Sequence, residues 1–246
     1  MSLVAGRGPL GSDRAGWFSS PVPDGLVYVE PHRRRVQAFR DDTPIIDTEA
    51  ALMVHRDGHP LSYAFPVGAT GNLPTEPVPE APGYVRVPWD AVEVWLEEGR
   101  PLVHYPPNPY HRVDCRPTGR RLTVRTHGTT LVDTADTVIV FETAMAPRLY
   151  VAPTAVRTDL LRRSPSTSYC NYKGYATYWS AEIGGTLIED VAWSYDDPLP
   201  ESLPIRGHLS FDAARVELHA ELPATQAQTP CAVAELRYRT GCLGGE

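Results

Sequence analysis

The sequence lacks long apolar runs, paired cysteines and an excess of basic charge. No apolar run approaches the roughly eighteen residues that a membrane-spanning helix needs, and residues 1–18 contain no continuous apolar segment like that of a secretory signal. The four cysteines are widely spaced and include no C-x-x-C pair, which excludes a common zinc framework. We therefore expect a cytoplasmic protein with reduced thiols and no membrane partner.

Positive charge is too scarce for broad binding to nucleic acid. The formal net charge is −7, whereas binding along a phosphate backbone needs a basic face. His55 and His59 stand four residues apart, but no histidine lies in an H-E-x-x-H or another metal-ligand spacing. The sequence also lacks G-x-G-x-x-G, a P-loop and G-x-S-x-G. We expect no nucleic acid and no metal, and the cofactor stays unknown.

Lysine is nearly absent, and the position of the single one is informative. The remaining 22 of the 23 basic side chains are arginine, whereas Lys173 lies in the aromatic run YCNYKGYATYW over 169–179. Arginine stays charged and binds flat oxyanions, but a lysine amine can lose its proton when buried and act as a base or nucleophile. Lys173 is therefore the first candidate for chemistry. The alternative is that it only begins a turn with Gly174.

One stretch of the sequence occurs twice, at an offset of 86 residues. Residues 34–59 align with 120–145, and this self-similarity indicates an internal duplication. The second copy is longer, because it has 55 residues over 153–207 where the first has 20 over 66–85, and the added segment contains the lysine. The identical pairs are Arg34/Arg120, Arg35/Arg121, Thr43/Thr129, Asp47/Asp133, Thr48/Thr134 and Val54/Val140.

This comparison divides the chain into five parts. We expect an N-terminal arm over 1–32, a shortened first copy over 33–102 and a linker over 103–118. A complete second copy with the candidate site follows over 119–223, and a C-terminal tail over 224–246 ends the chain.

Short β-branched runs bounded by Gly, Thr and Pro predict a mainly β fold with little helix. We expect two related compact β domains, each a small barrel or a set of tent-like sheets. Gly184-Gly185 joins two strand-like runs and predicts a hairpin. The runs 89–96 and 214–222 are interpreted as strands, and 154–163 is the best candidate for a helix.

Cys170 precedes the lysine by three residues and is the second candidate for catalysis. A thiol near an ammonium ionises more readily, which makes a thiolate nucleophile available. The alternative is a buried, inert cysteine. If the protein is an enzyme, an imine formed on Lys173 or attack by the Cys170 thiolate would be the step to test.

The aromatic residues around the lysine could line a pocket whose polar groups orient a ligand. Packing in the core is the competing use of these aromatics, and turn formation is the competing use of the polar residues. Asp159 could pair with Lys173 or lie free at the surface. The candidate ligand-binding residues are Tyr172, Gly174, Tyr178, Trp179, Trp193, Ser194, Tyr195, Asp197 and Asp159.

The segments YCNYKGYATYW and AWSYDDP resemble the family known as domain of unknown function 427. The family pattern is roughly T-x-C-P-x-K-G-x-A-x-Y-[YW] followed by A-W-x-Y-x-D-P, and Asn171 departs from it where proline is usual. The resemblance covers 119–223 well and 33–102 as a shortened copy without the motif. Tandem chains of this kind resemble those of actinobacteria. The matching residues are Cys170, Lys173, Gly174, Ala176, Tyr178, Trp179, Ala192, Trp193, Tyr195, Asp197 and Pro198.

The resemblance implies a compact, mainly β domain without an established reaction. A nucleotidyltransferase-like label is sometimes attached to the family, but the sequence lacks the G-S…D-x-D carboxylate pattern of metal-bound nucleotide, so this activity is not expected. We expect the second copy to bind a small molecule of unknown identity, with catalysis through Lys173 or Cys170 as one outcome. The alternative is a non-catalytic module for ligand sensing or protein association. An oligomer is compatible with both.

Overall fold

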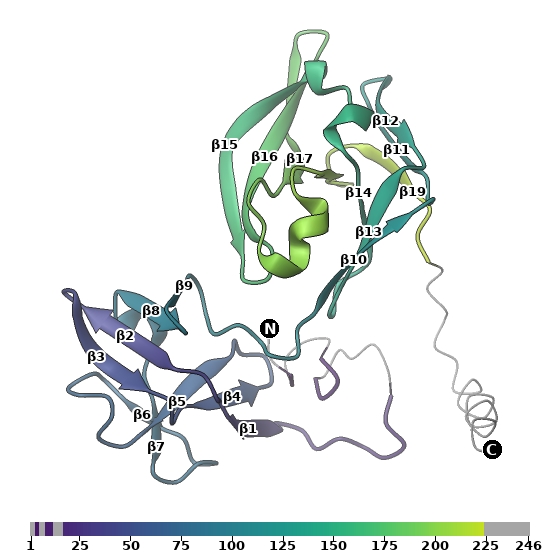
Figure 1. Ribbon diagram of the computed structural model, residues 1–246. Coiled ribbons are helices and arrows are strands. Elements are labelled where there is room, and N and C mark those ends of the chain that lie inside the picture. The colour runs from purple at the N-terminus through teal and green to yellow at the C-terminus, as the bar shows by residue number, and fades with distance from the viewer. Residues whose placement is uncertain (1–2, 5–7, 12–16, 224–246) are drawn as a thin grey trace, which may run out of the picture.

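The computed structural model describes residues 3–4, 8–11 and 17–223 (Figure 1). Over this part of the chain the structure is mainly β, as predicted, and every helical element is a short 3-10 turn. The strands form five antiparallel sheets with open edges, so the small barrel is not observed. None of the helical turns among these residues has the length and apolar character that crossing a membrane requires. The tail expected over 224–246 and parts of the arm expected over 1–32 lie outside the described residues.

The first half of the chain forms two sheets that share an apolar core, and a smaller apolar cluster includes Val54 and Ala64 of the first sheet. The sheets have the orders β1-β4-β5-β7-β6 and β3-β2-β8-β9. Met53 and Phe65 from the first sheet and Trp95 from the second meet in the core. The strands are β1 (Val27–Pro31), β2 (Val36–Arg40), β3 (Thr43–Thr48), β4 (Leu52–Arg56), β5 (Ser62–Pro66), β6 (Glu76–Pro77), β7 (Tyr84–Arg86), β8 (Val94–Glu97) and β9 (Arg100–Leu102).

The second half forms three sheets, with the orders β10-β13-β14, β12-β11-β19 and β15-β16-β17-β18. Leu131, Val191 and Phe211 lie in the main apolar core, to which strands of all three sheets contribute. The strands are β10 (Val113–Thr118), β11 (Leu122–Thr126), β12 (Thr129–Thr134), β13 (Thr137–Glu142), β14 (Arg148–Tyr150), β15 (Leu161–Cys170), β16 (Gly174–Ile183), β17 (Thr186–Ser194), β18 (Leu209–Phe211) and β19 (Glu217–Ala220).

Equivalent strands of the two halves pair in the same register. Val36 lies opposite Thr48 on β2 and β3, and Leu122 lies opposite Thr134 on β11 and β12, which is the same pairing 86 residues later. Both hairpins also carry a bulge two residues after these pairs, and β4 and β13 pair with β1 and β10 at the same offset. The repeated sequence therefore corresponds to repeated strand pairing.

Two strands lie in segments that the sequence did not predict as part of either domain. Val27–Pro31, from the expected arm, pairs with β4, and Val113–Thr118, from the expected linker, pairs with β13. Each strand covers an edge that would otherwise expose unpaired backbone groups. Both compact units therefore begin earlier than the repeat alone suggested.

The predicted β16–β17 hairpin is confirmed, whereas the predicted helix is wrong. Gly184 and Gly185 both have positive φ, at 57° and 81°, as a tight two-residue turn requires. The segment 154–163 contains only two 3-10 turns, η2 (Pro153–Ala155) and η3 (Thr158–Leu160). Between them Val156 is extended and buried and forms a bridge to Val132, which stops the helix.

The predicted strand over 89–96 is shorter than expected and displaced. Trp89–Ala91 forms the 3-10 turn η1, and the strand covers Val94–Glu97. The Trp95 indole N–H donates to the Trp89 carbonyl oxygen at 2.8 Å, so the turn is fastened to the strand that follows it. The counterpart strand is likewise confined to Glu217–Ala220.

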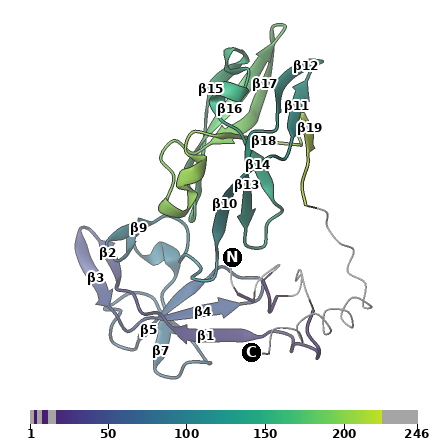
Figure 2. The same ribbon diagram turned by 45° about the vertical axis from the view of Figure 1, so that its right-hand side comes forward.

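The two halves form separate lobes that meet at the tip of the β15–β16 hairpin (Figures 1 and 2). The Arg100 guanidinium of β9 donates to the backbone oxygen of Asn171 at 3.3 Å. The Asn171 side-chain amide in turn donates to the Tyr105 carbonyl oxygen at 3.1 Å. The segment that carries the single lysine is thus held against the first half.

Candidate functional site

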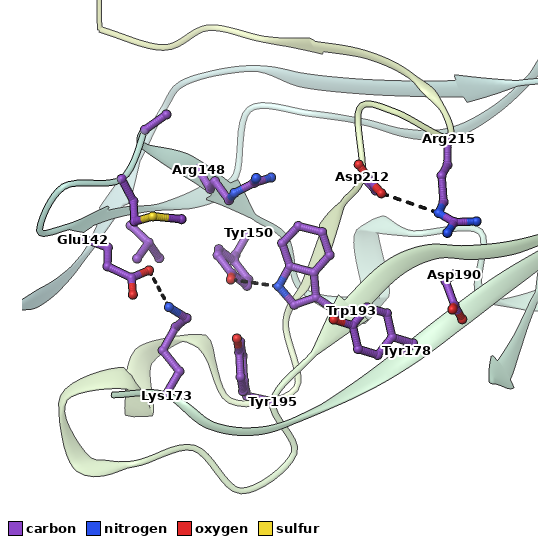
Figure 3. A pocket seen from close by; sticks show the side chains of 13 residues that line it. Glu142, Arg148, Tyr150, Lys173, Tyr178, Asp190, Trp193, Tyr195, Asp212 and Arg215 are labelled. Carbon is purple, nitrogen blue, oxygen red and sulfur yellow. Dashed lines mark hydrogen bonds and ion pairs between the residues drawn. The ribbon is translucent and has the colours of Figure 1, made fainter. Parts of the chain in front are cut away.

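A pocket of about 360 Å³ lies in the second half, between β13, β14, β16 and β17 (Figure 3). The tip of the β15–β16 hairpin supplies Lys173 at one end, and the turn after β18 supplies Asp212 and Arg215 at the other. Its volume is within the usual range of small-molecule sites. The lining residues are Val140, Glu142, Met145, Ala146, Arg148, Tyr150, Lys173, Tyr178, Asp190, Trp193, Tyr195, Asp212 and Arg215.

A tight turn directs the lysine side chain into this pocket. The Lys173 backbone N–H donates to the Cys170 carbonyl oxygen at 3.3 Å, and Gly174 follows with a φ of +96°. This left-handed conformation favours glycine, and a Cβ there would lie 3.4 Å from the Asp197 carbonyl oxygen. The Lys173 carbonyl oxygen also accepts from the Leu199 N–H at 3.1 Å, so the turn is fixed from both sides.

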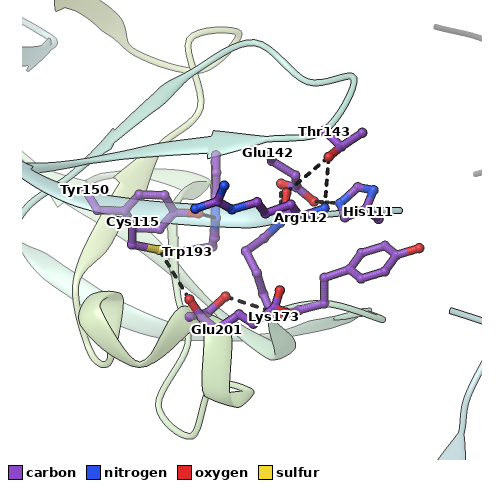
Figure 4. Close-up of polar contacts among 11 residues, drawn as sticks. His111, Arg112, Cys115, Glu142, Thr143, Tyr150, Lys173, Trp193 and Glu201 are labelled. Carbon is purple, nitrogen blue, oxygen red and sulfur yellow. Dashed lines mark hydrogen bonds and ion pairs between the residues drawn. The ribbon is translucent and has the colours of Figure 1, made fainter. Parts of the chain in front are cut away.

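The lysine forms a buried ion pair with Glu142, the last residue of β13 (Figure 3). Only 9% of the Lys173 side chain and 14% of the Glu142 side chain are exposed. The other Glu142 oxygen lies 3.1 Å from Nε2 of His111, whose ring stacks on Tyr172 with centroids 3.6 Å apart (Figure 4). Burial raises the pKa of Glu142, but the His111 hydrogen bond and the Lys173 charge outweigh it and hold the pKa below its usual value.

Aromatic side chains form the walls beside this ion pair. The Trp193 indole N–H donates to the Tyr150 hydroxyl at 3.1 Å, and the Tyr178 hydroxyl lies 3.0 Å from that of Ser168. The Arg148 guanidinium stands over the Trp193 ring at 5.0 Å from its centroid. The pocket therefore combines flat apolar surface with fixed polar groups, as ligand sites usually do.

Carboxylates and an arginine line the opposite end of the pocket. Asp212 and Arg215 form an ion pair at 3.5 Å, and the Ser166 hydroxyl donates to Oδ2 of Asp190 at 2.8 Å. Asp190 has a positive φ of 52°, which is uncommon for a residue other than glycine. Its Oδ1 is buried and accepts no hydrogen bond among the described residues.

Four of the side chains predicted for the site lie in the pocket: Lys173, Tyr178, Trp193 and Tyr195. Cys170 does not line it. Its free thiol packs against an apolar cluster that includes Val113, and no described histidine forms a hydrogen bond with it. The two residues stay close in the same turn, but only the Lys173 side chain lines the pocket.

Four further predicted residues have structural contacts outside the pocket, namely Tyr172, Gly174, Trp179 and Ser194. Tyr172 lies on the other side of the hairpin tip, where its hydroxyl accepts from the Asn108 N–H at 2.9 Å. Trp179 points to the sheet face opposite Tyr178, because successive side chains of a strand alternate, and its indole donates to the Ser194 hydroxyl at 3.0 Å. Gly174 shapes the turn.

The two predicted aspartates are also elsewhere, and the proposed Asp159–Lys173 pair is wrong. Asp159 pairs with Arg157 at 2.7 Å, while Lys173 pairs with Glu142. Asp197 has a side chain 95% exposed and faces Arg206 at 3.3 Å. The ten-residue strand β15 separates Asp159 from the lysine along the chain.

Several residues that line the pocket were not predicted from the sequence. The sequence contains a signal for one of them. Glu142 aligns with Arg56 at the offset of 86, so equivalent strand ends in the two copies carry side chains of opposite charge. The other residues lie on β14, on β17 and in the turn after β18, and no distinctive pattern marked them. The missed polar and aromatic residues are Glu142, Arg148, Tyr150, Asp190, Asp212 and Arg215.

Among the described residues, no group of three or more His, Cys, Asp or Glu side chains could hold a metal ion.

Comparison with known proteins gives one family. Residues 114–221 match the model of the family described as Domain of unknown function (DUF427), and no curated protein matches the chain. All residues that line the pocket fall inside the matched range. The match covers less than half of the chain, and residues 114–221 are therefore described as similar to the DUF427 family.

Proposed function

We propose that the DUF427-like domain binds a small organic molecule in the 360 Å³ pocket and that Lys173 fixes its orientation. One observation carries this proposal: the only lysine of the chain is enclosed, ion-paired and directed into a hollow with aromatic walls. A compact ammonium can share such a space with a ligand, whereas a planar guanidinium would need more room.

Non-covalent binding is supported better than covalent chemistry. An ammonium held in an ion pair has no lone pair with which to attack a carbonyl carbon. Glu142 would have to remove the proton, but its lowered pKa makes it a weak base. Cys170, the other candidate nucleophile, lies outside the pocket. We therefore assign Lys173 a binding role and make no assignment of catalysis to Cys170.

The first half is proposed to be a duplicated copy that supports the second. Its strand pairing at the offset of 86 and its exposed ion pair Arg35–Asp47, which corresponds to Arg121–Asp133, favour a common origin. It has no counterpart of the lysine hairpin, and Arg56 stands in the place of Glu142. The site is accordingly proposed for one half only.

A ligand screen with matched variants tests the binding proposal. A fragment library would be screened by protein-detected NMR against the wild type, Lys173→Arg and Arg206→Lys, the last being an exposed basic residue outside the pocket. We expect fragments that bind the wild type and the Arg206 variant but bind Lys173→Arg at least tenfold more weakly. If every fragment that binds the wild type binds Lys173→Arg with the same affinity, the proposal is refuted.

A structural or protein-interaction role is the second candidate, and one observation favours it. The same hairpin that carries Lys173 contacts the first half through Arg100 and Asn171, and contacts the segment between the two halves through Asn171 and Tyr172. If the motif serves only this junction, Lys173→Arg and Tyr172→Phe should both lower the melting temperature, and no fragment should bind near β13 and β17. Circular dichroism and the NMR screen together separate this outcome from ligand binding.

A further inference from the structure

Two buried tyrosine hydroxyls in the pocket have protons that no described residue accepts. Tyr150 and Tyr195 line the pocket and are only 2% and 5% exposed. The Tyr150 oxygen accepts a hydrogen bond from Trp193, but the Tyr150 O–H itself donates to no acceptor among the described residues. The Tyr195 hydroxyl forms no hydrogen bond in the described part of the chain. Neither phenol oxygen is a fully buried atom without a partner, so the two hydroxyls are placed to donate to an acceptor that enters the pocket from outside the chain.

The ammonium of Lys173 adds further free donors to the same space. It carries three N–H groups, and within the described residues one acceptor, Glu142, is present. The Tyr195 hydroxyl points toward the region between Lys173 and Tyr150 (Figure 3). Three side chains from three separate segments thus offer hydrogens to one small volume.

Both phenols keep their protons at neutral pH. Burial raises the pKa of Tyr150 and of Tyr195, and the negative charge of Glu142 raises them further. They act as hydrogen-bond donors and cannot themselves balance the positive charge in this part of the pocket.

The charged side chains that line the pocket balance overall, but they are unevenly placed. At the end that holds Lys173, the lysine and Glu142 cancel each other, and Arg148 has no carboxylate partner among the described residues. Asp190, the carboxylate that has no cation partner there, lies at the opposite end. A ligand group with one negative charge and two acceptor oxygens would match the charge at the Lys173 end. A phosphate dianion would exceed it and would lie close to the Glu142 carboxylate.

We propose that the pocket binds a small carboxylic acid, whose carboxylate accepts hydrogen bonds from Tyr150, Tyr195 and Lys173 and lies near Arg148. The apolar body of the acid would lie against Trp193 and the neighbouring aromatic wall. This inference rests on the proposed binding function and specifies the chemical class of its ligand.

The probes are 2-naphthoate, its neutral counterpart 2-naphthamide and 2-naphthyl phosphate, each titrated into the full chain and followed by NMR. We expect the carboxylate to bind the wild type at least tenfold tighter than the amide or the phosphate. Tyr195→Phe and Tyr150→Phe should each weaken naphthoate binding by about tenfold, because hydrogen bonds to a charged group are lost. Tyr175→Phe is the control, since Tyr175 is 63% exposed and does not line the pocket.

Several outcomes would overturn the proposal. Equal affinity for carboxylate and amide, tighter binding of the phosphate, no binding of naphthoate, or an equal loss in all three tyrosine variants would each do so. If amide and carboxylate bind equally and Lys173→Arg weakens both, the binding function stands and only the carboxylate assignment fails. The melting temperature of free Tyr195→Phe gives a second measurement: it should not fall, because the lost hydroxyl has no partner to lose.

Discussion

Replacing Lys173 by methionine should destabilise the protein strongly, because the substitution leaves the Glu142 carboxylate buried without its cation. Both side chains are at least 86% buried, with exposed fractions of 9% and 14%. Removing one partner of a buried ion pair typically costs about 3–5 kcal/mol. The hydrogen bond from His111 stays in place and should keep the loss toward the lower end of that range.

The matched control is the pair Arg121–Asp133 in the same half of the chain. Its side chains are 57% and 42% exposed, and surface pairs are worth about 0–1 kcal/mol. Free energies of unfolding would be measured by urea denaturation at pH 7, with tryptophan fluorescence as the signal. We expect Lys173→Met to lose at least about 2 kcal/mol more than Arg121→Met.

The double variant Lys173→Met/Glu142→Gln completes the test. Because the glutamine removes the uncompensated charge, the double variant should be more stable than Lys173→Met alone. If Lys173→Met costs no more than Arg121→Met, or if adding Glu142→Gln brings no recovery, the ion pair does not control the energetics of this site and the reasoning above is refuted.

Two further predictions concern Glu97 and Gly174. Burial raises the pKa of Glu97, but hydrogen bonds from His32, Tyr63 and Arg34 lower it to about 2, so its contribution is present above pH 4.5 and lost as the pH falls toward 2. The difference between the ordinary and the lowered pKa corresponds to about 3 kcal/mol of folding free energy. As the pH falls over this range, the free energy of unfolding measured in urea should decrease less for Glu97→Gln than for the wild type. Equal decreases would contradict the role given to Glu97. Gly174→Ala should destabilise by about 1–2 kcal/mol, because φ there is +96°, whereas Gly119→Ala, at a glycine without positive φ, should cost less; equal melting temperatures would contradict this.

The sequence predicted the β elements well where local chemistry decides the backbone. Gly184 and Gly185 required the turn that the structure contains, and strand-like runs flank it on both sides. The helix expected over 154–163 failed because Val156 gains more from a buried bridge to Val132 than from a helical turn. That competition depends on a strand twenty-four residues away and is invisible in the local pattern.

The candidate site shows the same division. The composition alone singled out Lys173, and the aromatic run around it indicated where a pocket could form. The sequence could not identify the carboxylate that pairs with the lysine. The ten residues of β15, at roughly 3.3 Å each, place Asp159 about 30 Å from the hairpin tip, whereas the fold returns Glu142 on β13 to the same place.

The sequence by itself determined the mainly β character, the turn glycines, the repeat at an offset of 86 residues and the residue on which the site is centred, because each can be read from the residue types and their order along the chain. The tertiary structure alone decided which side chains face the pocket, which carboxylate balances the lysine, and which tyrosine hydroxyls have no acceptor. These are properties of groups brought together from β13, β14, the β15–β16 hairpin and β17. Hydrogen bonds and ion pairs act only over a few ångströms, so they become defined only when the sheets pack.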